Sequence, residues 1–582
     1  MPERILRFLT WPRANLRLAI AFLLIGLVAV WYSLPAFSIA YTEGFQPSVV
    51  INAYALRLGD PHIADTLYPF NGRFFLLTRL GTSLAVLALQ YLGNLTGLEA
   101  FRLLGIGSLV LLLGAILTLL WRVYRVGPAL GLLCCILFPP IFESAYLPND
   151  DLPSAALICL GVLLFWTRPS IARTVLTGLL LGTAALLRLD AVLVTPAFAI
   201  LLLTEVQGWG ARALRAGIAG IIGAAIPIIA YRLCGLSFLD TFSAVNQALT
   251  LWDRPNRPLY YDSHTIVASV TVAGGLAWVL GVTSFARARR WRDLALAVVV
   301  PLLYIAVYRS QLVEGRYLLP LSPFILLAVA EGLRSIIGLP RRWRLVALAG
   351  FAVGFAIWIM PPLAALKASL IADPDGPRLI LGRAWNPLPV LWWQGRLRAG
   401  QAALETQIER IAATPDPVIV TGYWNGDRLT TLLLLEHGFA LQPDRTPEPC
   451  RGIAETLVRG PIVLTQIRTH IPFLFHASEP VTWEKAGLPC LRAVAPTARR
   501  VLFVGSGMLD SPTVRLDGPG VIFSSAHDQS PPLIPRLVSV LGGMSVAELP
   551  IENVSAVLGE QLTPEDRRAA VDALARRADL LR

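Results

Sequence analysis

The chain has 582 residues, of which 55% are hydrophobic and only 15% are charged, with a mean hydropathy of +0.61. Soluble globular proteins average about 25% charged residues, so this composition excludes an ordinary soluble domain and indicates a membrane protein with several spans. The formal net charge of +12 does not indicate nucleic-acid binding, because the arginines stand in small clusters between apolar runs.

The first two thirds of the sequence predict an α-helical polytopic membrane domain over residues 1–366. A helix that crosses about 30 Å of hydrocarbon needs about 20 apolar residues, and about eleven stretches approach this length. They lie near 17–37, 102–121, 127–146, 153–167, 174–188, 190–205, 214–234, 264–284, 293–308, 317–338 and 345–366.

Arginine clusters predict the orientation of these spans. They precede the first span and fill alternate loops, so an N-terminus in the cytoplasm places all of them on the cytoplasmic side. Counting the apolar stretch 74–93 as a further span would put most of these loops outside. We therefore expect residues 38–100 to form one large external loop with amphipathic segments along the membrane surface.

Acidic residues gather in the loops predicted to be external. Glu43 follows the first span, and a carboxylate that is partly desolvated at a membrane boundary suits general-base chemistry; the alternative is a solvated loop glutamate. The same loop carries a cluster within fourteen residues, in which Asp60 could simply cap a turn. Its members are Asp60, His62, Asp65 and Arg73.

Asp150 and Asp151 stand between two apolar runs, in "ESAYLPNDDLPS". Ionisable residues at membrane depth are costly and are read first as functional, although an aspartate followed by Pro153 also suits the start of a helix. Paired carboxylates can hold a divalent cation, Mg²⁺ or Mn²⁺, between themselves and a phosphate. The sequence leaves metal dependence open.

Three other charged residues lie at predicted external boundaries. Arg316, in "EGRYLLPLSP", can pair with a lipid phosphate, or with Glu314 in a plain salt bridge. Arg188 and Asp190, in "LLRLDA", are expected to form a structural ion pair.

Residues 367–582 predict a small α/β domain. Strand-like runs at 416–424, 460–467 and 499–507 alternate with helical segments, and a last helix is expected at 563–581. Eleven spans place this domain outside the cytoplasm, where Cys450 and Cys490 can form a disulfide. It contains no nucleotide-binding or hydrolase motif, which favours a scaffold or recognition role.

The order of these motifs resembles the GT-C superfamily, the polytopic glycosyltransferases that use polyprenyl-phosphate sugars and include the aminoarabinose and protein O-mannosyl transferases. The matching pieces fall within about residues 15–366. They are "YTEGFQ…LRLGDPHIADTLYPF", "LFPPIFESAYLPNDDLPSAAL", "LLRLDAVLVTPAF" and "GRYLLPLSPFILLAVAEGL". One departure is Thr42-Glu43, which leaves a single carboxylate where many relatives have Asp-Glu or an Asp.

The resemblance implies transfer of a sugar from a polyprenyl-phosphate donor to an envelope glycan, lipid or protein, with inversion at the anomeric carbon. Glu43, or failing it Asp65, would be the base, and Arg316 or Arg73 would stabilise the leaving phosphate. The remaining residues implied at the donor are His62, Asp65 and the pair Asp150 and Asp151. The expected location is the inner membrane of a bacterium. The rival readings are a transporter or lipid flippase, an envelope polysaccharide polymerase or ligase, and a non-catalytic membrane anchor.

Overall fold

The computed structural model describes the helical part of the chain over residues 45–57, 71–141, 150–167, 170–204, 208–252, 269–308 and 315–351, with a few single residues beside these ranges. It also describes short strands between 417 and 550, and Leu432, Leu435 and Glu436 among them. The predicted first span, the terminal helix at 563–581, and Cys450 and Cys490 lie outside the described residues.

The described part of residues 1–366 is helical, as predicted. Three helical stretches are long and apolar enough to cross a membrane, Gly97–Tyr124, Trp209–Leu233 and Gly315–Gly338, and several shorter apolar helices pack beside them. The count of eleven spans remains a prediction. The helices are α3 (Phe45–Arg57), α5 (Asn71–Thr78), α6 (Leu80–Gly93), α7 (Gly97–Tyr124), α8 (Pro128–Ile136), α10 (Asp151–Thr167), α11 (Ile171–Leu187), η2 (Leu189–Val194), α12 (Thr195–Leu203), α13 (Trp209–Leu233), α14 (Phe238–Trp252), α16 (Val272–Arg287), α17 (Trp291–Tyr308), η4 (Gly315–Leu321) and α18 (Ser322–Gly338).

Small residues let the helices of the bundle approach one another closely. A Cβ atom on Gly281 of α16 would overlap the backbone of Ala328 in α18, and one on Gly332 of α18 would overlap Ala277 in α16. Gly182 plays the same part between α11 and α13. In lipid, where burial of apolar surface does not drive helices together, such close packing supplies much of the attraction.

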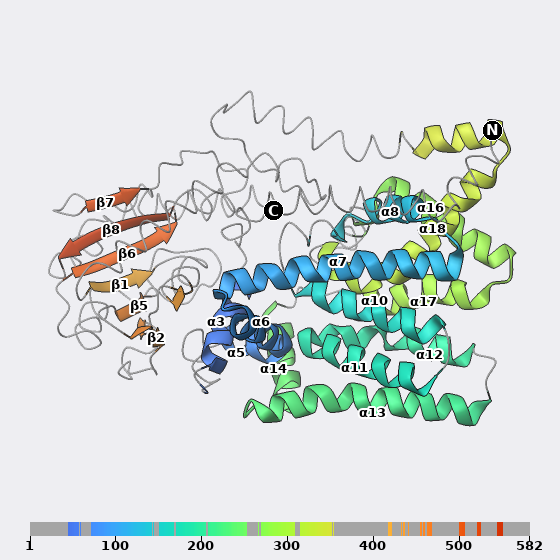
Figure 1. Ribbon diagram of the computed structural model, residues 1–582. Helices are drawn as coiled ribbons and strands as arrows, with labels where there is room; N and C mark the ends of the chain where they lie inside the picture. Colours follow the sequence, from blue (N-terminus) through green and yellow to red (C-terminus); the bar gives the residue numbers. More distant parts are fainter. Residues whose placement is uncertain are drawn as a thin grey trace.

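Four shorter helices, α3, α5, α6 and α14, lie at one end of the bundle (Figure 1). The stretch 74–93 falls in α5 and α6, which are interrupted at Arg79, and each is shorter than a span requires. Helix α14 falls in a segment expected to be a loop. Its apolar residues Phe238 and Ala244 belong to the same hydrophobic cluster as Leu76 and Leu77 of α5, and this packing accounts for the helix.

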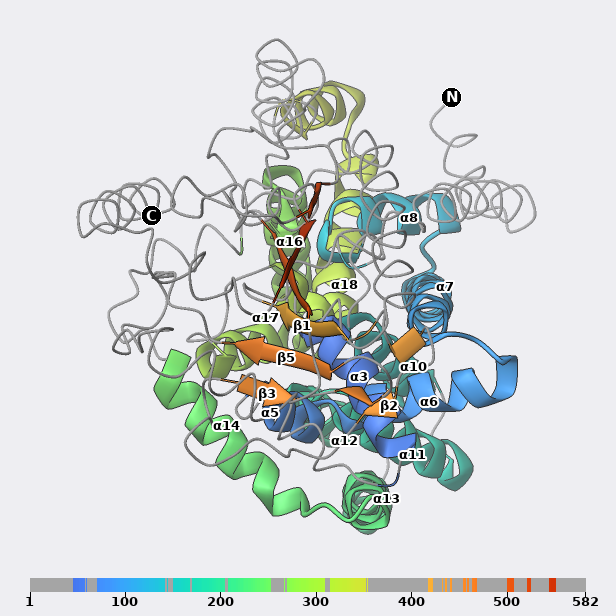
Figure 2. The same cartoon turned by 90° about the vertical axis from the view of Figure 1, so that its left-hand side faces the viewer.

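The described strands of residues 367–582 lie beyond this same end, as Figure 1 and the end-on view in Figure 2 show. Six form one sheet in the order β3-β5-β1-β6-β8-β7, in which β5, β1 and β6 run parallel and coincide with the three predicted strands. The domain boundary at 366 remains a prediction. The strands are β1 (Pro417–Thr421), β2 (Ala440–Leu441), β3 (Ala454–Thr456), β4 (Val458–Arg459), β5 (Val463–Ile467), β6 (Arg500–Ser506), β7 (Val521–Ser524) and β8 (Met544–Pro550).

Candidate active site

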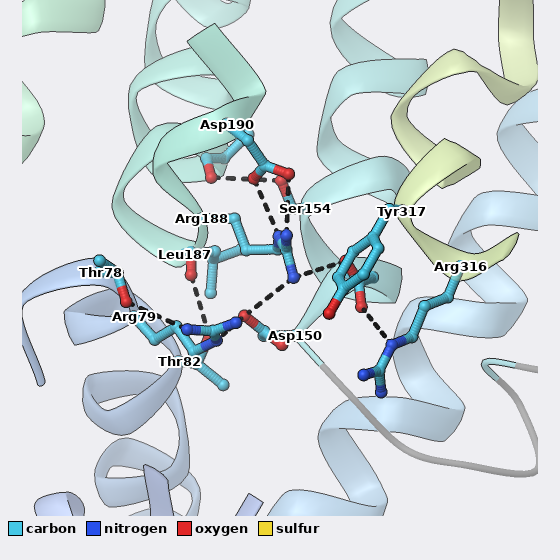
Figure 3. Close-up of polar contacts among 12 residues, drawn as sticks. Thr78, Arg79, Thr82, Asp150, Ser154, Leu187, Arg188, Asp190, Arg316 and Tyr317 are labelled. Carbon is cyan, nitrogen blue, oxygen red and sulfur yellow. Dashed lines mark hydrogen bonds and ion pairs between the residues drawn. The ribbon is translucent and has the colours of Figure 1, made fainter. Parts of the chain in front are cut away.

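Six charged side chains from four separate parts of the chain meet at the end of the bundle nearest α6. We refer to them as the Arg–Asp cluster (Figure 3). These four segments are the break between α5 and α6, the start of α10, the junction of α11 with η2, and η4. The members are Arg79, Asp150, Asp151, Arg188, Asp190 and Arg316.

The cluster is a chain of alternating charges. Arg79 Nε lies 2.6 Å from Asp150 Oδ2, and Arg188 Nη1 lies 3.5 Å from the same oxygen and 2.5 Å from Asp151 Oδ1. Arg316 Nε lies 3.7 Å from Asp151 Oδ2, the longest of these ion pairs. Arg188 also donates two hydrogen bonds to Asp190, from Nε to Oδ1 (2.9 Å) and from Nη2 to Oδ2 (2.8 Å). This is the bidentate geometry typical of a guanidinium with a carboxylate.

The packing of α6 and α10 against α11 places Arg188 among these groups. The hydroxyl of Thr82 in α6 donates to the Leu187 carbonyl (3.3 Å), and that of Ser154 in α10 donates to the Ala184 carbonyl (3.3 Å). Gly81 lies so near the backbone of Leu186 and Leu187 that a Cβ atom there would clash with it. The end of α11 is therefore held on two sides immediately before Arg188.

Tyr304 of α17 hydrogen-bonds to the cluster through Asp190. It is fully buried, and its hydroxyl contacts Asp190 Oδ2 (3.2 Å) and the Tyr317 carbonyl (2.9 Å). The ring of Tyr317 lies beside the guanidinium groups of Arg188 and Arg316, at 5.6 and 5.3 Å from its centroid. Three elements, α17, η2 and η4, are thus tied together around Asp190.

Charge balance explains how these side chains can be withdrawn from water. Three guanidinium groups face three carboxylates, so the formal charges cancel; Asp150, Asp151, Arg188 and Arg316 are at most 4% exposed, and the side chains of Asp190 and Arg79 are 10% and 12% exposed. Buried ions are tolerated when they are paired and hydrogen-bonded. Among the described residues, the carboxylate of Asp150 contacts arginines and not the first turn of α10, so helix capping does not account for it.

Two solved structures of one protein share the architecture of this chain. ArnT from Cupriavidus metallidurans bound to undecaprenyl phosphate matches with a TM-score of 0.52 and 15% identity, over 93% of this chain and 99% of that chain. The same protein in the apo state matches with a TM-score of 0.54 and 15% identity, over 94% and 100%.

This chain has the ArnT fold. The similarity to GT-C glycosyltransferases expected from the sequence is thereby confirmed in the fold, which is that of a polytopic membrane protein. No protein-family model and no curated protein matches the sequence.

Within this ArnT fold, Asp150, Asp151 and Arg316, which the sequence placed on one face of the membrane, lie together. The ion pair of Arg188 with Asp190 is observed, and it joins the same group. The roles assigned to these residues remain predictions. So do those of the other candidates: Arg73 lies in α5 with its side chain undescribed, and Glu43, His62 and Asp65 lie outside the described residues.

Arg79 is the member of the cluster that sequence reasoning missed. It was read as part of an amphipathic surface segment, "FFLLTRLGTSLAVLALQYLG". The available signal was its isolation, because a single arginine within an apolar run needs a partner at membrane depth. The following Gly81 was a second signal, since it permits the close approach to α11.

The divalent cation predicted between Asp150 and Asp151 remains a prediction, and these carboxylates fit it poorly. Both are already ion-paired with arginines, whose positive charges oppose a metal ion. In the part of the chain that the structure describes, no group of three or more His, Cys, Asp or Glu residues could hold a metal. The phosphate binding proposed below therefore uses arginine side chains and no metal ion.

Proposed function

We propose that this chain is a membrane glycosyltransferase that transfers a sugar from a polyprenyl-phosphate donor to an acceptor of the cell envelope. The observation that carries the proposal is the Arg–Asp cluster, in which the two buried arginines Arg188 and Arg316 and the largely buried Arg79 meet in a fold shared with a protein that binds undecaprenyl phosphate. Guanidinium groups are the side chains best suited to bind phosphate oxygens.

Arg316 and Arg79 are the arginines that we assign to the donor phosphate. They stand at the two ends of the alternating chain, so each has carboxylates on one side only within the cluster. The contact of Arg316 with Asp151 is longer than that of Arg188, at 3.7 Å against 2.5 Å. Arg188 sits between all three carboxylates and acts as the fixed centre that positions them.

The proposed reaction is one displacement at the anomeric carbon. An acceptor hydroxyl oxygen forms the new bond to that carbon, the bond from the carbon to the phosphate oxygen breaks, and the electron pair leaves with polyprenyl phosphate. The proton of the hydroxyl passes to a carboxylate base, for which we propose Glu43. The donor phosphate begins as a diester with one negative charge and gains charge as it leaves, so nearby guanidinium groups stabilise the transition state more than the ground state.

We further propose that the Arg–Asp cluster faces the outside of a bacterial inner membrane, with the N-terminus in the cytoplasm and residues 367–582 outside. The arginine-rich loops support this orientation, because they fall at the opposite ends of the same helices. A donor carried by a lipid is consistent with it, since such a donor reaches the outer face through the bilayer.

The test uses the purified full-length protein with radiolabelled polyprenyl-phosphate sugars and envelope lipid, glycan or protein as acceptor. We expect Arg316→Gln and Arg79→Gln each to lower the transfer rate about 100-fold, the typical effect of removing one group that stabilises developing negative charge. The matched control is Arg215→Gln, which removes an equally buried arginine at the far end of the bundle, where its Nε donates to Thr174 (2.9 Å).

The proposal fails if Arg316→Gln transfers sugar as fast as the wild type. It also fails if the wild type moves labelled lipid across a vesicle membrane without forming a glycosylated product, because that outcome identifies a transporter. Glu43→Gln tests the base separately: unchanged transfer removes Glu43 from the mechanism and leaves the phosphate assignment intact.

A further inference from the structure

The end of the bundle opposite the Arg–Asp cluster gathers several helix termini around Tyr124, the last residue of α7. The guanidinium of Arg290, which precedes α17, lies 5.1 Å from the centre of the Tyr124 ring, and the Trp166 ring of α10 lies 6.1 Å from it. Arg334 of α18 donates a hydrogen bond to the Tyr124 carbonyl (3.2 Å). The turns that follow α7 and α16 are thus neighbours.

Among the described residues, the arginines at this meeting point outnumber the acidic side chains. Arg290 Nε lies 2.7 Å from Asp293 and its Nη1 lies 3.2 Å from Glu331, and Arg292 Nε lies 3.3 Å from Asp293. Four further arginines at the same helix ends are exposed and make no ion pair with the described residues. They are Arg122, Arg125, Arg287 and Arg289.

Two of these arginines occupy a backbone conformation that disfavours any side chain. Arg125 ends α7 with φ 56°, and Arg289 lies in the turn between α16 and α17 with φ 54°. Glycine adopts this left-handed conformation without the steric cost of a Cβ atom, and asparagine tolerates it better than arginine. Turn geometry alone therefore does not explain arginine at either position. What arginine adds at both is an exposed positive charge.

Exposed tryptophans indicate that this end of the bundle lies at a membrane–water boundary. Trp121, Trp291 and Trp343 are 44%, 63% and 55% exposed, and each is next to an arginine in the sequence. Tryptophan is enriched at the boundary between hydrocarbon and headgroups. We propose that this end of the bundle is a binding surface for anionic phospholipid headgroups, with Arg125 and Arg289 among its principal ligands.

The test measures how phosphatidylglycerol stabilises the purified full-length protein in mixed micelles with phosphatidylcholine. An arginine near an anionic surface contributes about fivefold to binding (roughly 1 kcal/mol). We expect the double variant Arg125→Gly/Arg289→Gly to need about 30-fold more phosphatidylglycerol for half of the thermal shift. In pure phosphatidylcholine the same variant should melt at or above the wild-type temperature, because glycine removes the backbone strain at both turns.

Two control variants separate charge from position. Arg125→Lys/Arg289→Lys keeps both charges and should respond to phosphatidylglycerol nearly as the wild type does. Arg232→Gln removes an exposed arginine from the last turn of α13, away from this surface, and should also respond as the wild type does. An unchanged response of the glycine double variant overturns the proposal, as does an equal response of the wild type to inorganic phosphate. A lower melting temperature of the glycine variant in phosphatidylcholine overturns the argument from backbone strain.

Discussion

Replacing Arg188 by glutamine should destabilise the protein more than any other single change in the Arg–Asp cluster. Its guanidinium contacts three carboxylates, at 2.5 Å for Asp151, 2.8 Å for Asp190 and 3.5 Å for Asp150, and it is only 4% exposed. Without it, three buried carboxylates share two arginines. Breaking a buried ion pair in this way costs about 3–5 kcal/mol.

The assay is equilibrium unfolding in mixed micelles of increasing SDS content, followed by tryptophan fluorescence. Arg188→Lys keeps the charge but loses the bidentate grip, so we expect a loss of about 1–2 kcal/mol. Exposed Arg232 serves as the control, and its change to glutamine should stay within about 0.5 kcal/mol.

The decisive comparison adds Asp190→Asn to Arg188→Gln. The double variant has two arginines and two aspartates, so charge balance returns and it should be more stable than Arg188→Gln alone, by about 1–2 kcal/mol. Strict additivity of the two single losses would refute the reasoning, because it would mean that the charges in the cluster do not depend on one another.

Three further changes test other parts of the structure. Tyr304→Phe removes the hydroxyl that contacts Asp190, and it should lower the free energy of unfolding by about 1 kcal/mol and slow sugar transfer several-fold, measured by initial rates. Gly332→Ala drives a methyl group into the backbone of α16 and should cost about 1–3 kcal/mol in the SDS assay, whereas Gly338→Ala, which meets open space on the same helix, should cost nothing. Glu436→Ala removes the carboxylate that accepts from a backbone N–H at the start of α7 (2.7 Å), and exchange of that amide should accelerate about tenfold or more; unchanged exchange would show that the contact does not hold the helix end.

Much of the site was predictable because arginine-rich loops indicate which ends of the membrane helices face the cytoplasm. Asp150, Arg188 and Arg316 stand at helix ends that the arginine-rich loops assign to one face, and this assignment brings them near one another without any knowledge of packing. Which atoms meet depends on close contacts between distant segments. Gly81 against Leu187 is such a contact, and no local pattern near Arg79 specifies its partner Asp150, the residue before α10.

Some of the C-terminal strands were also predictable from the sequence, and others were not. The three parallel strands β1, β5 and β6 are short apolar runs bounded by turns, a pattern that predicts buried strands. The strands β7 and β8 pair antiparallel beside them and were not among the predicted strands. Helix α14 was not predicted either, because its apolar residues find their packing partners on α5, a distant segment of the chain.

The pairing of every guanidinium in the Arg–Asp cluster with an aspartate has a consequence for selectivity. A dissolved anion such as inorganic phosphate must compete with carboxylates that are already in place and that never diffuse away. A ligand whose long hydrocarbon tail dissolves in the surrounding bilayer arrives at a high local concentration and overcomes the same competition. On the proposed function, these aspartates favour anions delivered by a lipid over small soluble anions.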